Sequence, residues 1–136
     1  MGTVNAVVGL RMLGRGREVP ASARFSYDTA SPYEVRAVFC LGLDEPVEWV
    51  FARSLLTDGL NGPAGAGDIK FSPSAGGRVL VIGLSSPFGT ARFEAPAASI
   101  ARFLDATRRL VPDGAEPAWA DLDAGIAAIL AEGGPP

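Results

Sequence analysis

Hydrophobic residues alternate with polar or small residues along the first half of the chain, as they do in half-buried strands. The alternation is clearest over residues 33–41, and the same period occurs over 3–13, 19–27 and 47–52. Short connections rich in Gly, Pro, Asp and Ser separate these segments. The pattern predicts four antiparallel strands joined by turns.

The segment 47–60 changes its hydrophobic period halfway along. Its apolar residues first alternate with polar ones and then recur at helical spacing: Val47, Trp49, Phe51, Leu55, Leu56 and Leu60. We therefore expect a strand that runs directly into a short helix. Gly59 and the sequence Asn61-Gly62-Pro63 should end this helix, and 61–67 should form a flexible loop.

The second half of the chain repeats the strand pattern over 68–72, 78–84 and 89–94. A helix should follow from Pro96 to Leu110, because apolar residues recur there at helical spacing and Pro112 stops it. A last helix should begin near Asp121, which we interpret as an N-cap in preference to a metal ligand paired with Asp123.

Together these elements predict an α+β fold. Two antiparallel β meanders of about seven strands should form a barrel-like or strongly curved sheet, with a short middle helix and two C-terminal helices. We expect one domain over residues 1–132 and a flexible tail over 133–136.

The second face of the third and fourth predicted strands is also partly apolar. It carries Val38, Cys40, Val50 and Ala52. Because so few helices are available to cover it, we expect another subunit to contribute part of the cover, so that the protein forms a homo-oligomer.

Composition restricts the chemistry. The 136 residues contain one cysteine and no histidine, so a histidine general base and Cys/His zinc sites are excluded. We expect no enzyme activity, no metal and no cofactor. The net charge of −3 argues against nucleic acid as a partner, and we expect protein partners instead. The absence of an apolar run of membrane-spanning length and of a leader pattern predicts a cytoplasmic protein without a membrane span.

Four residues are candidates for partner binding. Glu48, Arg53 and Asp58 belong to the polar remainder of the 47–60 segment, which should face outward, and Phe88 lies at a predicted hairpin tip. Replacing Glu48 and Arg53 should then leave stability nearly intact.

Other polar and reactive residues have a structural interpretation. Arg102, Arg108 and Arg109 should form a solvated helix face with Asp105, although an anionic partner is the alternative. Cys40 should be a small buried residue and not a reactive thiol.

Several motifs, in the same order and spacing, resemble the SsgA-like proteins of actinobacteria, which regulate sporulation-specific cell division. These motifs are the 47–69 segment, Tyr27-Asp28-Thr29-Ala30 with Pro32-Tyr33, Leu84-Ser85-Ser86-Pro87, Glu94-Ala95-Pro96, and the region from Phe103-Leu104 to Asp121-Leu122-Asp123. The pattern is closest to the SsgB-type members. Ser54 and Phe88 depart from it, since aspartate and a charged residue are common at these positions.

The resemblance implies a non-enzymatic adaptor that marks future septum sites and recruits the tubulin-like division protein FtsZ, with an SsgA-type paralogue helping to place it. It also implies a fold similar to the Whirly single-stranded DNA-binding proteins, and trimers. The alternative function is therefore single-stranded nucleic-acid binding, which rests on fold analogy alone.

Overall fold

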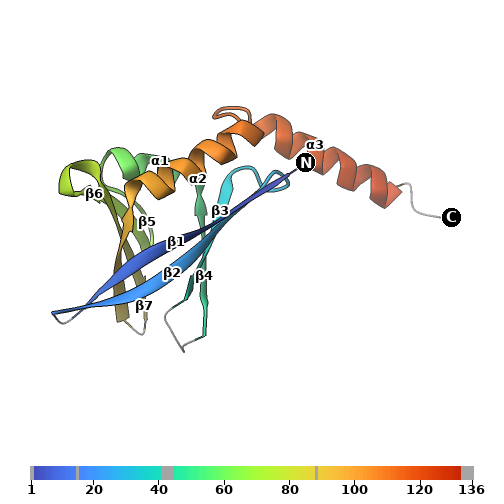
Figure 1. The fold of residues 1–136 in the computed structure, drawn as a ribbon. Helices are drawn as coiled ribbons and strands as arrows, with labels where there is room; N and C mark the ends of the chain where they lie inside the picture. Colours follow the sequence, from blue (N-terminus) through green and yellow to red (C-terminus); the bar gives the residue numbers. More distant parts are fainter. Residues whose placement is uncertain (1, 15, 41–44, 88, 133–136) are drawn as a thin grey trace.

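The computed structural model describes residues 2–14, 16–40, 45–87 and 89–132 (Figure 1). The strands are β1 (Thr3–Gly14), β2 (Arg17–Asp28), β3 (Glu34–Cys40), β4 (Val47–Ala52), β5 (Ala64–Ala66), β6 (Ile69–Ser74), β7 (Val79–Ser86) and β8 (Gly89–Pro96). The helices are α1 (Arg53–Asn61), the short 3-10 turn η1 (Ala75–Gly77), α2 (Ala97–Leu110) and α3 (Glu116–Glu132).

All eight strands belong to one antiparallel sheet in the order β4-β3-β2-β1-β8-β7-β6-β5. Each half of the chain forms a four-stranded meander, and the two meanders join where β1 pairs with β8. The sheet is strongly curled, and α1 and α2 lie across it (Figure 1). This arrangement confirms the predicted α+β fold with two meanders in a strongly curved sheet.

The core lies between the curled sheet and the helices. Aromatic pairs join distant segments there: Phe25 contacts Phe103 of α2, Phe39 contacts Phe93, and Phe51 contacts Phe71. Residues of β1 to β3 alternate between buried and exposed positions as the sequence predicts. Tyr33, the first residue of the predicted strand 33–41, lies just before β3 and is half exposed.

Helix α1 ends where Asn61-Gly62-Pro63 was predicted to end it, whereas Gly59, also expected to help end it, lies inside the helix. A side chain at this position would place its Cβ 2.3 Å from the Cβ of Phe71 on β6. Gly59 is therefore required for close approach of helix and strand, and the helix ends at Asn61, before Gly62 and Pro63.

The segment 61–67 was predicted to be a flexible loop, and this is wrong for its central residues. Ala64–Ala66 forms β5, which pairs with Ile69, Lys70 and Phe71 of β6 and completes the eighth strand. The strand lacks the β-branched and aromatic residues that identify strands in sequence, and its pairing with β6 and its packing against α1 stabilise it instead.

Helix α3 begins at Glu116, five residues before the predicted N-cap Asp121, which is therefore an exposed residue within the helix. Pro117 lies in the first turn, where its missing N–H is harmless. The helix continues away from the sheet and ends far from it (Figure 1). Within the described residues, no helix is long and apolar enough to cross a membrane. The predicted tail 133–136 lies outside the described residues.

Candidate interaction surfaces

The position of Arg53 differs most from the sequence prediction. It was expected on the outward polar edge, but its side chain is only 1% exposed and is among the largest fully buried side chains. The guanidinium carbon lies 4.9 Å from the centre of the Tyr27 ring. Nη1 donates to the carbonyl of Val111 at 2.7 Å and to Thr107 Oγ1 at 3.4 Å. Arg53 therefore joins α1 to the end of α2 and cannot contact a partner in this fold.

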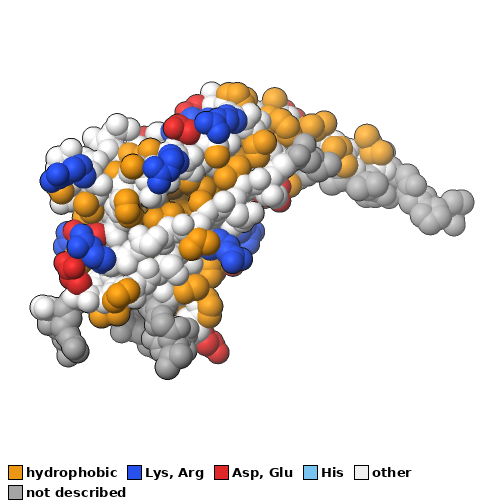
Figure 2. Space-filling model, viewed as in Figure 1, with side chains coloured by type: hydrophobic (Ala, Val, Ile, Leu, Met, Phe, Trp, Pro, Cys, Tyr) orange, Lys and Arg blue, Asp and Glu red, His pale blue; other side chains and the backbone are white. Residues whose placement is uncertain are grey.

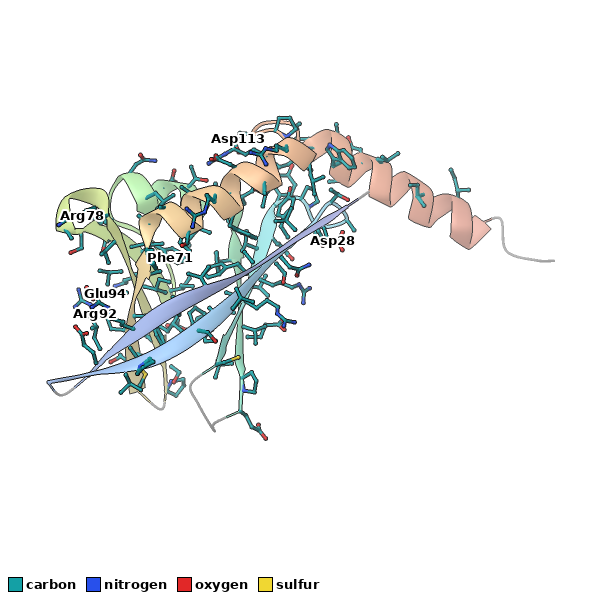
Figure 3. The ribbon with its side chains drawn as sticks, in the orientation of Figure 1. Asp28, Phe71, Arg78, Arg92, Glu94 and Asp113 are labelled. Carbon is teal, nitrogen blue, oxygen red and sulfur yellow. The ribbon has the colours of Figure 1, made fainter. Side chains whose placement is uncertain are left out.

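The second nitrogen of the Arg53 guanidinium faces carboxylates at the start of α3. Nη2 lies 3.1 Å from Glu116 Oε2 and 3.7 Å from Asp113 Oδ1, as ion pairs without a well-aligned hydrogen bond. Asp113 lies on the turn between α2 and α3 (Figure 3). The buried cation thus holds the turn that sets the direction of α3.

Two pKa values reflect this cluster. The N–H of Glu116 itself, at the start of α3, the guanidinium of Arg53 and the N–H of Gly114 lower the pKa of the Glu116 carboxyl, against the effect of its desolvation. Burial raises the pKa of the Tyr27 hydroxyl, although the charge of Arg53 opposes this. That hydroxyl donates to the carbonyl of Pro32 at 2.8 Å. At neutral pH the Glu116 carboxyl is therefore ionised and the Tyr27 hydroxyl is protonated.

Arg108 links the exposed side of the same junction. Its Nε lies 2.9 Å from Asp113 Oδ2, its Nη1 lies 3.2 Å from Asp105 Oδ1, and its Nη2 donates to Thr57 Oγ1 at 3.0 Å. Arg102 and Arg109 are exposed, as the solvated-face interpretation predicted, whereas Arg108 belongs to a structural network at this end of the helix.

An apolar hollow of about 270 Å³ opens between the two meanders on the inner side of the sheet. Most of its lining is apolar, with Phe39, Val47, Trp49, Leu84, Ala91 and Phe93 among the lining residues. Trp49, expected to be a core residue, is packed against the core and is only partly buried. The hollow therefore offers a position for an apolar side chain from outside the chain.

The outer face of the first meander mixes apolar and charged side chains. Val7 is 71% exposed and Val50 is 45% exposed, while Val38 and Cys40 are half-buried. Cys40 was expected to be buried. Glu48 lies on this face and forms an exposed ion pair with Arg36 at 3.1 Å. Because nothing in the described part of the chain covers Val7 or Val50, the face is available for contact.

The four candidate residues are not brought together as one site. Glu48 lies on β4 and Asp58 is exposed on α1, whereas Arg53 is buried and Phe88 lies outside the described residues. The alternation that identified Val47, Trp49 and Phe51 as inward-facing continues to Arg53, two residues further on. That spacing is the signal by which the buried position of Arg53 could have been predicted.

Helix α3 adds a further exposed apolar surface. Leu122 is 53% exposed and Ile129 is 68% exposed. Figure 2 shows apolar side chains following the helix as it leaves the body of the protein. The described residues contain no group of three or more cysteine or carboxylate side chains arranged to hold a metal ion. The accessible chemistry is thus that of apolar and ion-paired surfaces.

Comparison with known proteins gives a consistent result. The model of the family described as "Streptomyces sporulation and cell division protein, SsgA" matches residues 21–116. The sporulation-specific cell division protein SsgB of Thermobifida fusca is 47% identical over 94% of this chain and 95% of its own length. SsgB of Streptomyces coelicolor is 46% identical over 96% of this chain and 97% of its own length.

Solved structures agree with these matches. The crystal structure of an SsgA-like sporulation-specific cell division protein from Thermobifida fusca has a TM-score of 0.86 and 45% identity, and covers 93% of this chain and 95% of that chain. A structure from a study of SsgB mutations and longitudinal cell division in Streptomyces coelicolor has a TM-score of 0.81, with 87% and 95% covered. The resemblance seen in the sequence motifs is confirmed, whereas the likeness to Whirly proteins stays a prediction.

Proposed function

Because the chain belongs to the SsgA family of sporulation and cell division proteins, we propose that it regulates sporulation-specific cell division by marking septum sites and recruiting FtsZ. The observation that carries this proposal is the match to proteins named SsgB along almost the whole length of both chains. A match of this extent covers almost the whole chain and is not limited to one motif.

The proposed action is that of a non-enzymatic adaptor. Its support is the chemistry available on the described surface: the outer face with Val7 and Val50, the apolar hollow beside Trp49, and the uncovered side of α3. Exposed apolar side chains of this kind are typical of protein–protein contacts. In this proposal FtsZ and an SsgA-type paralogue are the partners, and the protein acts at the cytoplasmic side of the future septum.

We also propose that the protein acts as a homo-oligomer, and the family resemblance implies a trimer. The predicted need for a covering subunit is supported by the exposure of Val50 and Ala52 on β4. The exposed Leu122 and Ile129 on α3 add a second surface that association would remove from water.

Direct recruitment is tested by co-sedimentation of the purified chain with FtsZ of the same organism, polymerised with GTP. We expect the chain to enter the pellet together with the FtsZ polymer. In the control without polymer, we expect it to stay in the supernatant. Recovery of the chain only in the supernatant at every salt concentration would remove the support for direct recruitment.

Surface carboxylates provide the matched variants. We expect the double substitution Glu48→Lys and Asp58→Lys to weaken pelleting, because both side chains are exposed candidates for partner contact. Asp68→Lys is the control, since it makes the same type of charge change at another exposed position. Equal pelleting of both variants would exclude Glu48 and Asp58 from the contact. Phe88 remains a candidate contact from the sequence alone.

A further inference from the structure

Strand β4 is the outermost strand of the long first meander, and one of its edges faces away from β3. The register places Val35 opposite Phe51 and Arg36 opposite Val50, so that Tyr33 stands opposite Arg53. The N–H of Arg53 donates to the carbonyl of Tyr33 at 2.8 Å, which makes this a hydrogen-bonded pair.

Because hydrogen-bonded and non-hydrogen-bonded pairs alternate along an antiparallel ladder, the orientation of each backbone group on β4 follows. The residues in phase with Arg53, namely Val47, Trp49 and Phe51, bond to β3. Glu48 and Val50 lie in the opposite phase, so their N–H and C=O groups point away from β3, as does the N–H of Ala52. The C=O of Ala52 is excluded, because Ala52 is the N-cap residue of α1 and its carbonyl accepts the first hydrogen bond of that helix. Within the described part of the chain, the remaining groups form an unpaired row of donors and acceptors that matches another extended backbone.

The opposite edge of the sheet does not offer the same surface. It is formed by β5, which has only three residues and packs against α1. Strand β4 has six residues, and the ion-paired Glu48 is the charged side chain along it. Edge strands in proteins are usually protected by charge, proline or cover. On β4, however, Val47 and Val50 are both exposed, so this edge is weakly protected and is suited to pairing with another strand.

The side chains beside this edge specify what could pair with it. On the inner face, Val47 and Trp49 form one wall of the apolar hollow. On the outer face, Glu48 stands beside Val50, with the ion pair to Arg36 on the side of β3. An added strand would lie about 4.8 Å from β4, with its inward side chains at the mouth of the hollow and its outward ones beside Glu48.

We propose that β4 binds an extended peptide segment of a protein partner, which adds a strand to the sheet, inserts an apolar side chain into the hollow beside Trp49, and places a basic residue next to Glu48. The free backbone groups supply affinity, and the hollow and the carboxylate supply selectivity. The inference goes beyond the proposed function and does not depend on FtsZ as the source of the segment.

The test is selection of binding peptides against the purified full chain, with a phage-displayed library of random peptides long enough to pair with all of β4. We expect enrichment of sequences that alternate apolar and polar residues and contain a basic residue next to a large apolar one. We also expect hydrogen exchange of the amides of Glu48, Val50 and Ala52 to slow when an enriched synthetic peptide is added, because these amides become paired.

Val50→Pro is the decisive variant. It removes an N–H that points away from β3, so the ladder with β3 keeps its hydrogen bonds. We expect it to weaken peptide binding about tenfold or more, while the control Val50→Ala, which keeps the N–H, changes affinity little. Trp49→Ala should shift selection away from large apolar residues, and Glu48→Gln should remove the preference for a basic one.

Peptides that bind Val50→Pro and the unsubstituted protein equally well, with unchanged exchange at β4, would overturn the proposal. Thermal unfolding of Val50→Pro checks that it is folded; if it is not, the exchange measurement on the unsubstituted protein decides alone. A smaller oligomer for Val50→Pro with no effect on peptide binding would assign the edge to a second copy of the chain and would also overturn it.

Discussion

At the residue scale, Arg53 determines how the end of α2 and the start of α3 are held. A buried guanidinium is stable only when acceptors and opposite charges surround it. Here the Val111 carbonyl and Thr107 accept its hydrogen bonds, and Glu116 pairs with its charge. The sequence shows a charged residue at the start of a helix, where exposure is the usual outcome. Only the acceptors from distant segments make burial favourable, and for this reason the outward position predicted from the polar pattern was wrong.

Replacing Arg53 should therefore destabilise the protein. We expect Arg53→Ala to lower the free energy of unfolding by about 2–3 kcal/mol, because it leaves buried acceptors unpaired and a cavity beside Tyr27. Urea unfolding followed by circular dichroism measures this. The exposed Arg109→Ala is the control, with an expected change within about 0.5 kcal/mol. Equal stability of the two variants would contradict the structural role of Arg53.

The ionisation of Glu116 makes part of the stability dependent on pH. Its pKa is lower in the folded protein than its ordinary value of 4.5, so its contribution is present above that value and is lost as the pH falls through the folded pKa. We expect Glu116→Gln to be less stable than the unsubstituted protein at neutral pH, with a difference that shrinks in acid. Thermal unfolding across this pH range tests it, and a constant difference would contradict it.

At the scale of elements, the strands and α2 were predictable because their hydrophobic periods are long and regular. Strand β5 and the start of α3 were not. The residues Ala64, Gly65 and Ala66 have no strand pattern of their own and become a strand by pairing with β6. The start of α3 depends on Glu116, whose carboxylate accepts the N–H of Gly114 at 2.6 Å and also pairs with the buried Arg53. Asp121 is the stronger N-cap residue type, but it lacks these contacts.

The contact between α1 and β6 gives a prediction at this scale. Alanine has a higher helix propensity than glycine, yet we expect Gly59→Ala to destabilise the protein by about 1–3 kcal/mol, because the new Cβ would overlap Phe71. Gly125→Ala in α3 is the matched control, since its Cβ would meet nothing within 4 Å. Chemical denaturation compares the two variants. A stabilised Gly59→Ala would show that α1 does not approach β6 this closely.

At the scale of the whole molecule, core residues pack on the inner face of the curled sheet, apart from the hollow beside Trp49, and the outer face is partly apolar. Aromatic residues fill the core, but the chain has too few helices to cover every apolar surface. The hollow beside Trp49 and one side of α3 therefore stay exposed. The partly apolar outer face of β3 and β4 could be predicted from the sequence, and its cover by another subunit stays a proposal. The hollow could not, because it arises where segments far apart in sequence, β3 and β4 on one side and β7 and β8 on the other, come together.

Self-association should follow from these surfaces. We expect sedimentation velocity at micromolar concentration to show an oligomer, and the double substitution Leu122→Glu and Ile129→Glu to reduce its mass by placing charge on the exposed side of α3. The circular dichroism spectrum should stay unchanged, because both side chains are exposed in the single chain and its fold does not depend on them. A monomer at all concentrations tested would contradict the proposed oligomer.

The proposal that the protein marks septum sites and recruits FtsZ is tested most directly by the order of arrival in living cells. The measurement is time-lapse imaging of this chain and FtsZ, each fused to a different fluorescent protein, in sporulating cells of its own organism. We expect this chain to gather at future septum positions first and FtsZ then to assemble at the same positions. Arrival of this chain only after FtsZ, or at positions where FtsZ never assembles, would contradict it.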